Sequence, residues 1–215
     1  MVFENREHAA RLLAQRLEGY KGSHPLILAI PRGAVPMGKL LAEELQGELD
    51  VVLVRKLGAP GNPEFAIGSV DETGNVQLAS YANSYGITEF YIEKEKQAQL
   101  ATLRRRRALY TPVRPPIDPA GRTVIVVDDG IATGATMIAA LRAVRAKNPH
   151  RLIAATAVAP PDALQRLNEI ADEVTCLEVP ANFFAVGQFF RDFTQVSDEE
   201  VIAILRQSAR PQEQN

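Results

Sequence analysis

Short apolar runs alternate with stretches in which apolar residues recur at helical spacing. The runs lack the in-and-out alternation of half-exposed strands, so they predict strands that are buried on both faces. They lie at residues 26–30, 50–54, 124–127, 152–158 and 174–179. Helical spacing is found in the segments 5–19, 36–45, 138–144, 162–170 and 198–205, and the first of these helices is expected only to pack. Alternating units of this kind predict an α/β fold, with a mainly parallel sheet, helices on both faces and ligands at the carboxyl ends of the strands.

The middle of the chain departs from this pattern. Residues 65–70 and 76–78 flank an acidic turn and predict a β-hairpin. A long helix is expected from Thr88 to Tyr110, followed by a stiff, proline-rich connector at 111–119. Glycine and proline in 57–64 argue against a helix and against most strand pairing, so we expect a loop there.

Composition narrows the class of protein. The 215 residues are 46% hydrophobic and 23% charged, with a net charge of −2 and a pI near 6.0. One domain is expected at this length, and the charge gives no general attraction to nucleic acid. Cys176 is the single cysteine, which favours a reducing, cytoplasmic setting. The charged first residues and the lack of a long apolar run lead us to expect neither a signal peptide nor a membrane span.

The strongest local signal is the stretch from Val124 to Thr136, VIVVDDGIATGAT. A buried strand ends at Asp128 and Asp129, and a loop of small residues then leads into a helix. Such a loop presents backbone N–H groups to an anion, and the helix dipole adds partial positive charge. The two carboxylates beside this loop can accept hydrogen bonds from hydroxyl groups or bind a divalent cation. Phosphate on one side and a polyol on the other indicate a ribose 5-phosphate.

This stretch resembles the 5-phosphoribosyl-1-pyrophosphate (PRPP) signature of type I phosphoribosyltransferases. The resemblance implies that the 5-phosphate binds at Gly130, Ala132, Thr133, Gly134, Ala135 and Thr136. It also implies that Asp128 and Asp129 serve the ribose hydroxyls and, through these or water, Mg²⁺. An ordinary strand-to-helix turn with solvated acids is the alternative, and many members have glycine in place of Ala135.

A second strand-loop-helix unit carries Arg32, Gly33 and Ala34. It looks like the pyrophosphate loop of the same family, which often contains a cis peptide bond that does not involve a proline nitrogen. A plain turn with a surface arginine is the alternative. At the end of the strand predicted at 50–54, Lys56 is chosen as a further pyrophosphate ligand and Arg55 is kept as the alternative. The loop at 57–64 would then be the lid over PRPP.

The resemblance implies displacement of pyrophosphate from PRPP by a nitrogen nucleophile, a step of nucleotide metabolism. Arg32, Lys56, Asp128 and Asp129 form the expected catalytic set, with Mg²⁺ as cofactor. The 6-oxopurine members carry an aspartate where this chain has Ala132, so hypoxanthine and guanine are disfavoured as acceptors. Adenine, orotate-like and other acceptors stay open.

The resemblance also divides the chain into a core at about 20–179, a hood at about 180–196 with N-terminal contributions, and a tail at 207–215. The hood contains five of the eight phenylalanines, which either stack on a planar substrate or cover the sheet edge and the last helix. They are Phe183, Phe184, Phe189, Phe190 and Phe193.

Two further functions compete with a transferase. A regulatory protein could sense PRPP or a nucleotide in the same pocket without turnover. Arg104 to Arg107 could contact RNA, but a run of four covers every side of a helix and has no interleaved aromatic residues. A solvated or inter-subunit helix is therefore favoured, and a homodimer is left open.

Overall fold

The centre of the molecule is a five-stranded parallel sheet. The computed structural model describes residues 1–79, 81–82 and 86–209, and for residues 63 and 64 it describes the backbone alone. The strands lie in the order β2-β1-β6-β7-β8, and every neighbouring pair is parallel. Their bounds are β1 Leu26–Ala29, β2 Glu48–Val51, β6 Thr123–Asp128, β7 Arg151–Val158 and β8 Glu173–Glu178. The predicted α/β class with a mainly parallel sheet is confirmed.

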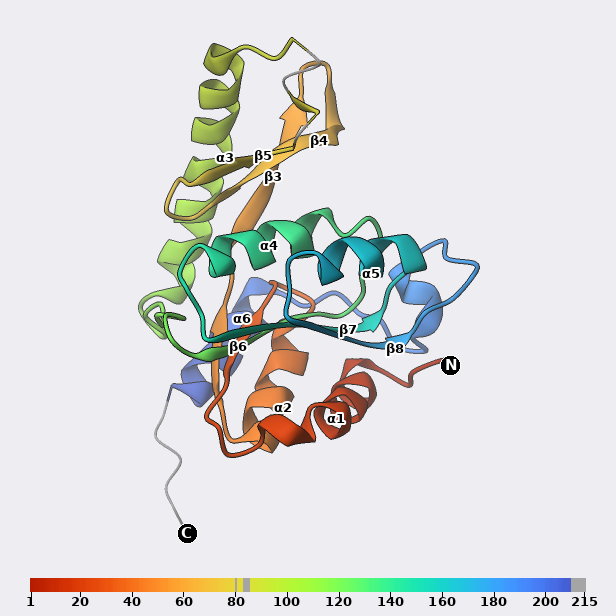
Figure 1. The fold of residues 1–215 in the computed structure, drawn as a ribbon. Helices are drawn as coiled ribbons and strands as arrows, with labels where there is room; N and C mark the ends of the chain where they lie inside the picture. Colours follow the sequence, from red (N-terminus) through yellow and green to blue (C-terminus); the bar gives the residue numbers. More distant parts are fainter. Residues whose placement is uncertain (80, 83–85, 210–215) are drawn as a thin grey trace.

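Helices cover both faces of this sheet (Figure 1). Helices α4 and α5 pack on one face, and α1, α2 and α6 pack on the other. Their bounds are α1 Arg6–Arg16, α2 Val35–Leu45, α4 Ala135–Arg145, α5 Pro161–Asn168 and α6 Asp198–Ser208, with short 3-10 helices at Glu18–Tyr20 (η1) and Val186–Phe189 (η3). Successive strand residues enter opposite layers: Leu26 packs with the α4 side and Ile27 with the α1 side. Both faces of the sheet are covered by helices, so successive strand residues are all buried and the strands appear in the sequence as unbroken apolar runs.

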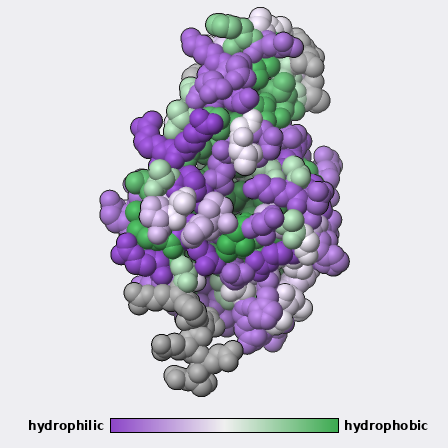
Figure 2. Space-filling view, turned by 90° about the vertical axis from the view of Figure 1, so that its left-hand side faces the viewer, coloured by the Kyte–Doolittle hydropathy of each residue, from purple (hydrophilic) through white to green (hydrophobic). Residues whose placement is uncertain are grey.

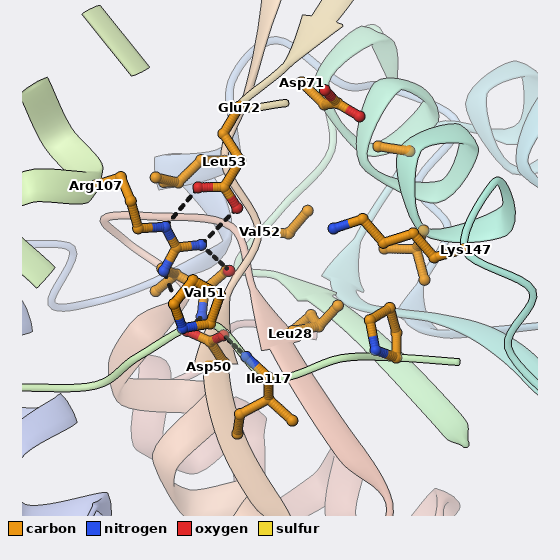
Figure 3. A pocket seen from close by; sticks show the side chains of 14 residues that line it. Leu28, Asp50, Val51, Val52, Leu53, Asp71, Glu72, Arg107, Ile117 and Lys147 are labelled. Atoms are coloured by element: carbon orange, nitrogen blue, oxygen red, sulfur yellow. Dashed lines mark hydrogen bonds and ion pairs between the residues drawn. The ribbon is translucent and has the colours of Figure 1, made fainter. Parts of the chain in front are cut away.

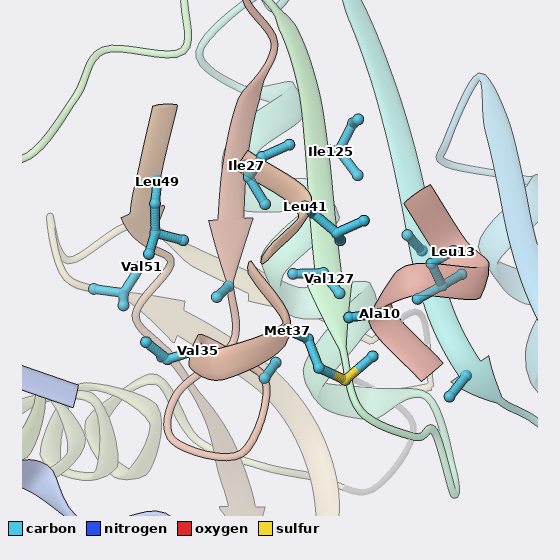
Figure 4. Close-up of a cluster of buried hydrophobic side chains, with 14 of the residues drawn as sticks. Ala10, Leu13, Ile27, Val35, Met37, Leu41, Leu49, Val51, Ile125 and Val127 are labelled. Atoms are coloured by element: carbon cyan, nitrogen blue, oxygen red, sulfur yellow. The ribbon is translucent and has the colours of Figure 1, made fainter. Parts of the chain in front are cut away.

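The core beneath the sheet holds the site-bearing strands in place (Figure 4). Ile125 and Val127 of β6 meet Leu13 of α1 and Met37 and Leu41 of α2, and all five side chains are fully buried. Burying each such side chain contributes about 1.5–3 kcal/mol. The loops at the carboxyl ends of β1 and β6 are therefore mounted on a rigid platform.

A second, three-stranded sheet projects from one side of the molecule (Figure 1). Strands β3 Val54–Ala59, β4 Asn62–Asp71 and β5 Val76–Leu78 are antiparallel, and α3 Glu89–Tyr110 packs against β3 and β4. We call these four elements the antiparallel subdomain. The hairpin predicted at 65–78 and the helix predicted at 88–110 are confirmed, and the Thr88 side chain caps α3 by accepting the Tyr91 N–H.

Two predictions in this region are wrong. The strand predicted at 50–54 is two elements, because β2 ends at Val51 and β3 begins at Val54 in the other sheet. The segment 57–64, expected to be a loop, belongs to the β3–β4 hairpin, in which Ala59 pairs with Asn62. The pairing shifts register on both sides of Gly58. Such an irregular ladder accommodates glycine and proline, which regular pairing excludes.

An ion-pair network ties the antiparallel subdomain to the parallel sheet (Figure 3). Arg107 of α3 donates to both carboxylate oxygens of Glu72, from Nε at 2.5 Å and from Nη2 at 2.7 Å. Arg107 Nη1 lies 3.5 Å from Oδ1 of Asp50 in β2. Asp50 is 2% exposed and also accepts the N–H groups of Val51 and Ile117. We call Arg107, Glu72 and Asp50 the Arg107 clamp.

The four consecutive arginines of α3 point to different sides of the helix. The Arg107 side chain is 12% exposed, whereas Arg104 and Arg105 are exposed. Figure 2, viewed from the side on which α3 lies, shows a largely hydrophilic surface. The prediction that this run does not form a single basic stripe is confirmed.

The chain after β8 runs irregularly to α6, apart from η3. Helix α6 continues through Ser208, so the tail predicted from residue 207 begins later than expected. Residues 210–215 of that predicted tail lie outside the described part of the chain. Among the described residues, no helix combines the length and the apolar character needed to cross a membrane.

Candidate active site

Two aspartates end the central strand of the parallel sheet. Asp128 is the last residue of β6 and is half-buried, and Asp129 follows it and is 9% exposed. The Asp129 N–H donates to Oδ1 of Asp128 at 3.0 Å. We call these residues the acid pair. Burial raises the pKa of Asp128 well above its usual range, and the adjacent Asp129 carboxylate acts in the same direction. The pair is thus arranged to receive positive charge or hydrogen-bond donors.

Residues 130–134 form a loop that leads from the acid pair into α4, whose first two residues are Ala135 and Thr136. We call residues 130–136 the Gly134 loop. Its Ile131 N–H donates to the Val158 carbonyl of β7 at 2.8 Å, which anchors the loop to the sheet. Gly134 has a φ of 79° in the left-handed region and provides no side chain to cap α4. The Ala135 N–H reaches Thr133 Oγ1 at 3.4 Å, and the N–H groups of the next residues in the first turn of α4 are left to bind an anion.

A residue absent from the sequence prediction supports this loop from α5. Arg166 donates from Nη2 to the Thr133 carbonyl at 2.7 Å and forms an ion pair with Asp162 at 3.4 Å. Helix α5 thereby fixes the backbone of the Gly134 loop. Nothing in the local sequence distinguishes Arg166 from an ordinary surface arginine, so only the tertiary contact identifies it.

The loop after β1, residues 30–34, reaches the acid pair from the neighbouring strand. We call it the Gly33 loop. Its Pro31–Arg32 peptide bond is cis, as the resemblance implied. A Cβ atom at Gly33 would overlap the Asp129 carboxylate, so only glycine fits here without displacing that side chain. The close approach places the Gly33 loop directly against the acid pair.

Arg32 points from the Gly33 loop toward the first residue of α6. Arg32 Nη1 lies 3.5 Å from Oδ2 of Asp198, and Oδ1 of Asp198 accepts the Tyr110 hydroxyl at 2.8 Å. Tyr110 is fully buried, and burial together with the Asp198 contact raises the pKa of its phenol. The Arg32 side chain is 39% exposed, so its guanidinium is accessible to a ligand.

A further arginine, Arg6, enters the site from the first turn of α1. Its Nε donates to Oδ2 of Asp129 at 2.8 Å, and each of these side chains is 12% exposed. We expected α1 only to pack. A cation at the first position of a helix opposes the helix dipole, which is a signal that the sequence did contain.

The open pocket at this edge brings together most of the predicted chemistry. Its described lining residues are Arg6, Ile30, Pro31, Arg32, Gly33, Asp128, Asp129, Val186, Phe193, Gln195 and Val196. Gly130 lies against Val186, so the Gly134 loop begins at the pocket wall. Lys56 is not among the lining residues, because it lies within β3 rather than at the end of a core strand. The Lys56 side chain is exposed, whereas Arg55 beside it is half-buried and donates a hydrogen bond to Gln99.

The phenylalanines of segment 180–193 mostly pack against one another. Phe189 and Phe190 are buried, and the Phe190 and Phe193 rings stack with centroids 4.9 Å apart. Phe183 stacks on Phe189 at 5.7 Å, whereas Phe184 is 88% exposed. Of the two fates expected for this cluster, packing accounts for most of its rings.

The acid pair does not by itself form a metal cage. Among the described residues, no three His, Cys, Asp or Glu side chains are grouped closely enough to hold a metal ion. Mg²⁺ is usually bound by one or two carboxylates, with water and substrate phosphates as its remaining ligands. The acid pair fits that mode of binding.

These features are shared with a known family. Residues 2–193 match the phosphoribosyl transferase domain, and this chain belongs to that family. It is 41% identical over 210 residues to a protein of Mycobacterium tuberculosis H37Rv whose name provisionally assigns it to the phosphoribosyl transferases. The match covers 97% of this chain and 47% of that relative, so this chain spans about half the relative's length.

Two solved structures have a similar fold. The crystal structure of TT1426 from Thermus thermophilus is 48% identical, with a TM-score of 0.90, and the match covers 98% of this chain and 100% of TT1426. The AQ2163 protein from Aquifex aeolicus is 14% identical with a TM-score of 0.50, over 81% of this chain and 72% of AQ2163. The latter likeness concerns the fold alone.

Proposed function

We propose that this protein is a Mg²⁺-dependent transferase that moves the 5-phosphoribosyl group of PRPP to a nitrogen nucleophile and releases pyrophosphate. The observation that carries the proposal is the contact between Gly33 and Asp129, which sets two anion-binding loops on either side of two carboxylates. PRPP has the matching order of groups: a 5-phosphate, two ribose hydroxyls and a pyrophosphate. Membership of the family supports the same reaction class.

The Gly134 loop binds the 5-phosphate in this proposal. Backbone N–H groups of Gly130 and of residues 132–136 surround the phosphate, and the Thr133 and Thr136 hydroxyls donate to it. The exposed positions of Ala132 and Thr133 support this role, as does the uncapped start of α4.

Pyrophosphate binds at the Gly33 loop. The backbone at Gly33 and Ala34 approaches its oxygens, and Arg32 provides a planar donor fork. Lys56 is retained as a further cation, contributed by the β3–β4 hairpin. That hairpin is also the proposed lid, because it replaces the loop expected at 57–64.

Asp128 and Asp129 would accept hydrogen bonds from the ribose hydroxyls and, through these hydroxyls or through water, would hold Mg²⁺. The metal would neutralise charge on the departing pyrophosphate. The carboxylates stabilise positive charge that develops on the ribose ring, while Arg32 stabilises the negative charge of the leaving group. No covalent protein nucleophile is needed.

The acceptor binds between the acid pair and the segment 186–196. Ala132 stands where an aspartate would manage the proton of a 6-oxopurine, so we propose an acceptor other than hypoxanthine or guanine. A cytoplasmic setting belongs to the same proposal. It is supported by the single Cys176, which has no second cysteine in this sequence with which to form a disulfide.

The test is to supply Mg²⁺, PRPP and a panel of nitrogenous bases and to measure pyrophosphate release. We expect release with at least one base outside the 6-oxopurine group. PRPP binding without release for any base would favour a regulatory sensor. If Asp128→Asn and Thr133→Ala both bound PRPP normally, the site assignment would be wrong.

A further inference from the structure

Arg6 has no role in the reaction described above, although it contacts the acid pair. We propose that Arg6 is a positioning residue of the PRPP site, which holds the Asp129 carboxylate against the Gly33 loop. The inference rests on the function proposed above. It makes the first turn of α1 part of the binding site, although the sequence pattern identified only a packing helix there.

The chain just before α1 is attached to the segment that forms one wall of the pocket. Phe3 forms an isolated parallel bridge with Phe190, in which the Phe3 N–H donates to the Phe189 carbonyl at 2.7 Å. The N–H groups of Arg191 and Asp192 donate in turn to the Phe3 and Glu4 carbonyls, each at 2.9 Å. These bonds fix the start of α1 and therefore the position from which the Arg6 side chain extends.

The guanidinium of Arg6 is held on three sides. Nε donates to Oδ2 of Asp129 at 2.8 Å, and Nη1 donates to the Thr194 carbonyl at 2.6 Å. The guanidinium carbon lies 4.0 Å from the centroid of the Phe193 ring. An arginine fork can make two directed bonds and stack on a ring at once, whereas a lysine ammonium is a single point charge. The arrangement therefore requires arginine in particular.

The same guanidinium also lies beside Gly33. A Cβ atom at Gly33 would lie 3.3 Å from Nη2 of Arg6 and would overlap Oδ2 of Asp129. Asp129 is thus enclosed between Gly33 and Arg6. Because a carboxylate side chain has rotamer freedom of its own, this enclosure determines where its remaining oxygen points when a ribose arrives.

Position and helix electrostatics oppose each other at Arg6. A cation in the first turn of a helix is disfavoured by the partial positive charge of the helix N-terminus. The Asp129 carboxylate offsets this cost, because the pair is mostly shielded from solvent. An ion pair that only stabilises the fold would offset the helix dipole in the same way. The test must therefore measure ligand binding and stability separately.

The experiment compares Arg6→Met, Arg6→Lys and Arg11→Met in the full chain. Arg11 is the matched control, since it lies on the same helix and its side chain is 56% exposed. It forms an ion pair with Glu7 at 2.6 Å and is not one of the residues that line the pocket. Calorimetry measures binding of PRPP with Mg²⁺ and, separately, of inorganic pyrophosphate with Mg²⁺. Thermal unfolding without ligand measures stability.

We expect Arg6→Met to weaken PRPP binding about tenfold, the size of effect typical of coupled neighbouring residues. Pyrophosphate binding should change far less, because it uses the Gly33 loop and needs no ribose contact from Asp129. Arg6→Lys should lose an intermediate amount of PRPP affinity, and it carries the test if Arg6→Met does not fold. Arg11→Met should bind both ligands as the unsubstituted chain does.

Two results would overturn the inference while leaving the proposed function intact. One is unchanged PRPP affinity in both Arg6 variants, and the other is an equal loss for PRPP and pyrophosphate. Absence of PRPP binding by the unsubstituted chain would overturn the proposed function and this inference together.

Discussion

Two regions of the molecule bring two carboxylates and one arginine together, and they differ in what those carboxylates have left to bind. In the Arg107 clamp, both oxygens of Glu72 accept from Arg107, and Asp50 accepts two backbone N–H groups as well as the guanidinium. In the acid pair, Asp128 accepts one backbone N–H and Asp129 one guanidinium N–H. No described residue bonds the second oxygen of either aspartate.

The difference shows that burial beside an arginine does not by itself indicate a functional acid. Carboxylates whose acceptor sites are filled within the protein hold elements together, as the Arg107 clamp holds the antiparallel subdomain to the parallel sheet. Carboxylates with unfilled acceptor sites facing a pocket can receive the donors of a ligand. Substitutions in the two regions should therefore separate into effects on stability and effects on binding.

The largest effect is expected in the Arg107 clamp. Arg107→Met leaves Glu72 and the buried Asp50 without their cation, which should lower the free energy of unfolding by about 3–5 kcal/mol. Urea unfolding measures this loss. Arg104→Met on the same helix is the control and should stay within about 0.5 kcal/mol, because Arg104 is exposed. Equal stability of the two variants would remove the distinction between the two regions.

In the acid pair the effect should fall on binding instead. Asp128→Asn removes a charged acceptor of the ribose hydroxyls and should weaken PRPP binding by about 10- to 100-fold. The raised pKa of Asp128 means that its charged form is disfavoured in the folded state, so a neutral side chain should not lower stability at neutral pH. Calorimetry and urea unfolding check the two halves of this prediction. A variant that is less stable yet binds PRPP normally would contradict both.

Gly33→Ala tests the contact between the Gly33 loop and the acid pair. The added Cβ displaces the Asp129 carboxylate, and overpacking of this kind costs about 1–3 kcal/mol. If this cost falls on the PRPP-binding conformation, PRPP affinity should drop by about fivefold or more. Gly19→Ala is the matched control, because no atom lies within 4 Å of its added Cβ. Equal PRPP affinity in the two variants would mean that a Cβ atom at Gly33 does not displace the Asp129 carboxylate, and it would contradict the prediction.

The smallest effect concerns pH and the Arg107 clamp. Burial raises the pKa of Asp50, so the native state binds this proton more tightly than the unfolded chain, whose aspartates titrate near pH 3.9. The tighter binding of this proton therefore stabilises the native state fully below that pH, and this contribution is lost as pH rises through the native pKa of Asp50. Asp50→Asn cannot titrate, so the stability difference between the parent chain and this variant should shrink from pH 4 upward. Urea unfolding at several pH values measures it, and a gap that widens with pH would have the wrong sign.

Local patterns were enough to predict the parallel sheet and the position of the Gly134 loop. The strand at 124–127 is apolar at every position because helices cover both of its faces, and that feature is visible in the sequence. Gly134 lies within two residues of both Thr133 and Thr136, so this motif can be recognised without any long-range contact. The same is true of Arg32, Gly33 and Ala34.

Long-range pairing accounts for what was missed. The residues 57–64 read as a loop, because glycine and proline seldom occur in regular strands, yet an irregular ladder with the rest of β4 makes them a hairpin. Lys56 was expected at the end of a core strand because nothing between Val51 and Val54 marks the change from one sheet to the other. The phenylalanines of 180–193 could equally stack on a substrate or cover the sheet edge and the last helix until their partners were known.

By itself the sequence determined the class of fold, the acid pair and the two loops, because each depends on residues close together in the chain. Only the tertiary structure decided that Arg6, which precedes Asp129 by 123 positions, bonds that carboxylate at 2.8 Å. It also decided that Arg107 occupies acceptor sites of the Glu72 and Asp50 carboxylates, while each carboxylate of the acid pair keeps an oxygen that no described residue bonds. Hydrogen-bond satisfaction depends on which groups meet in space, and no local pattern records that.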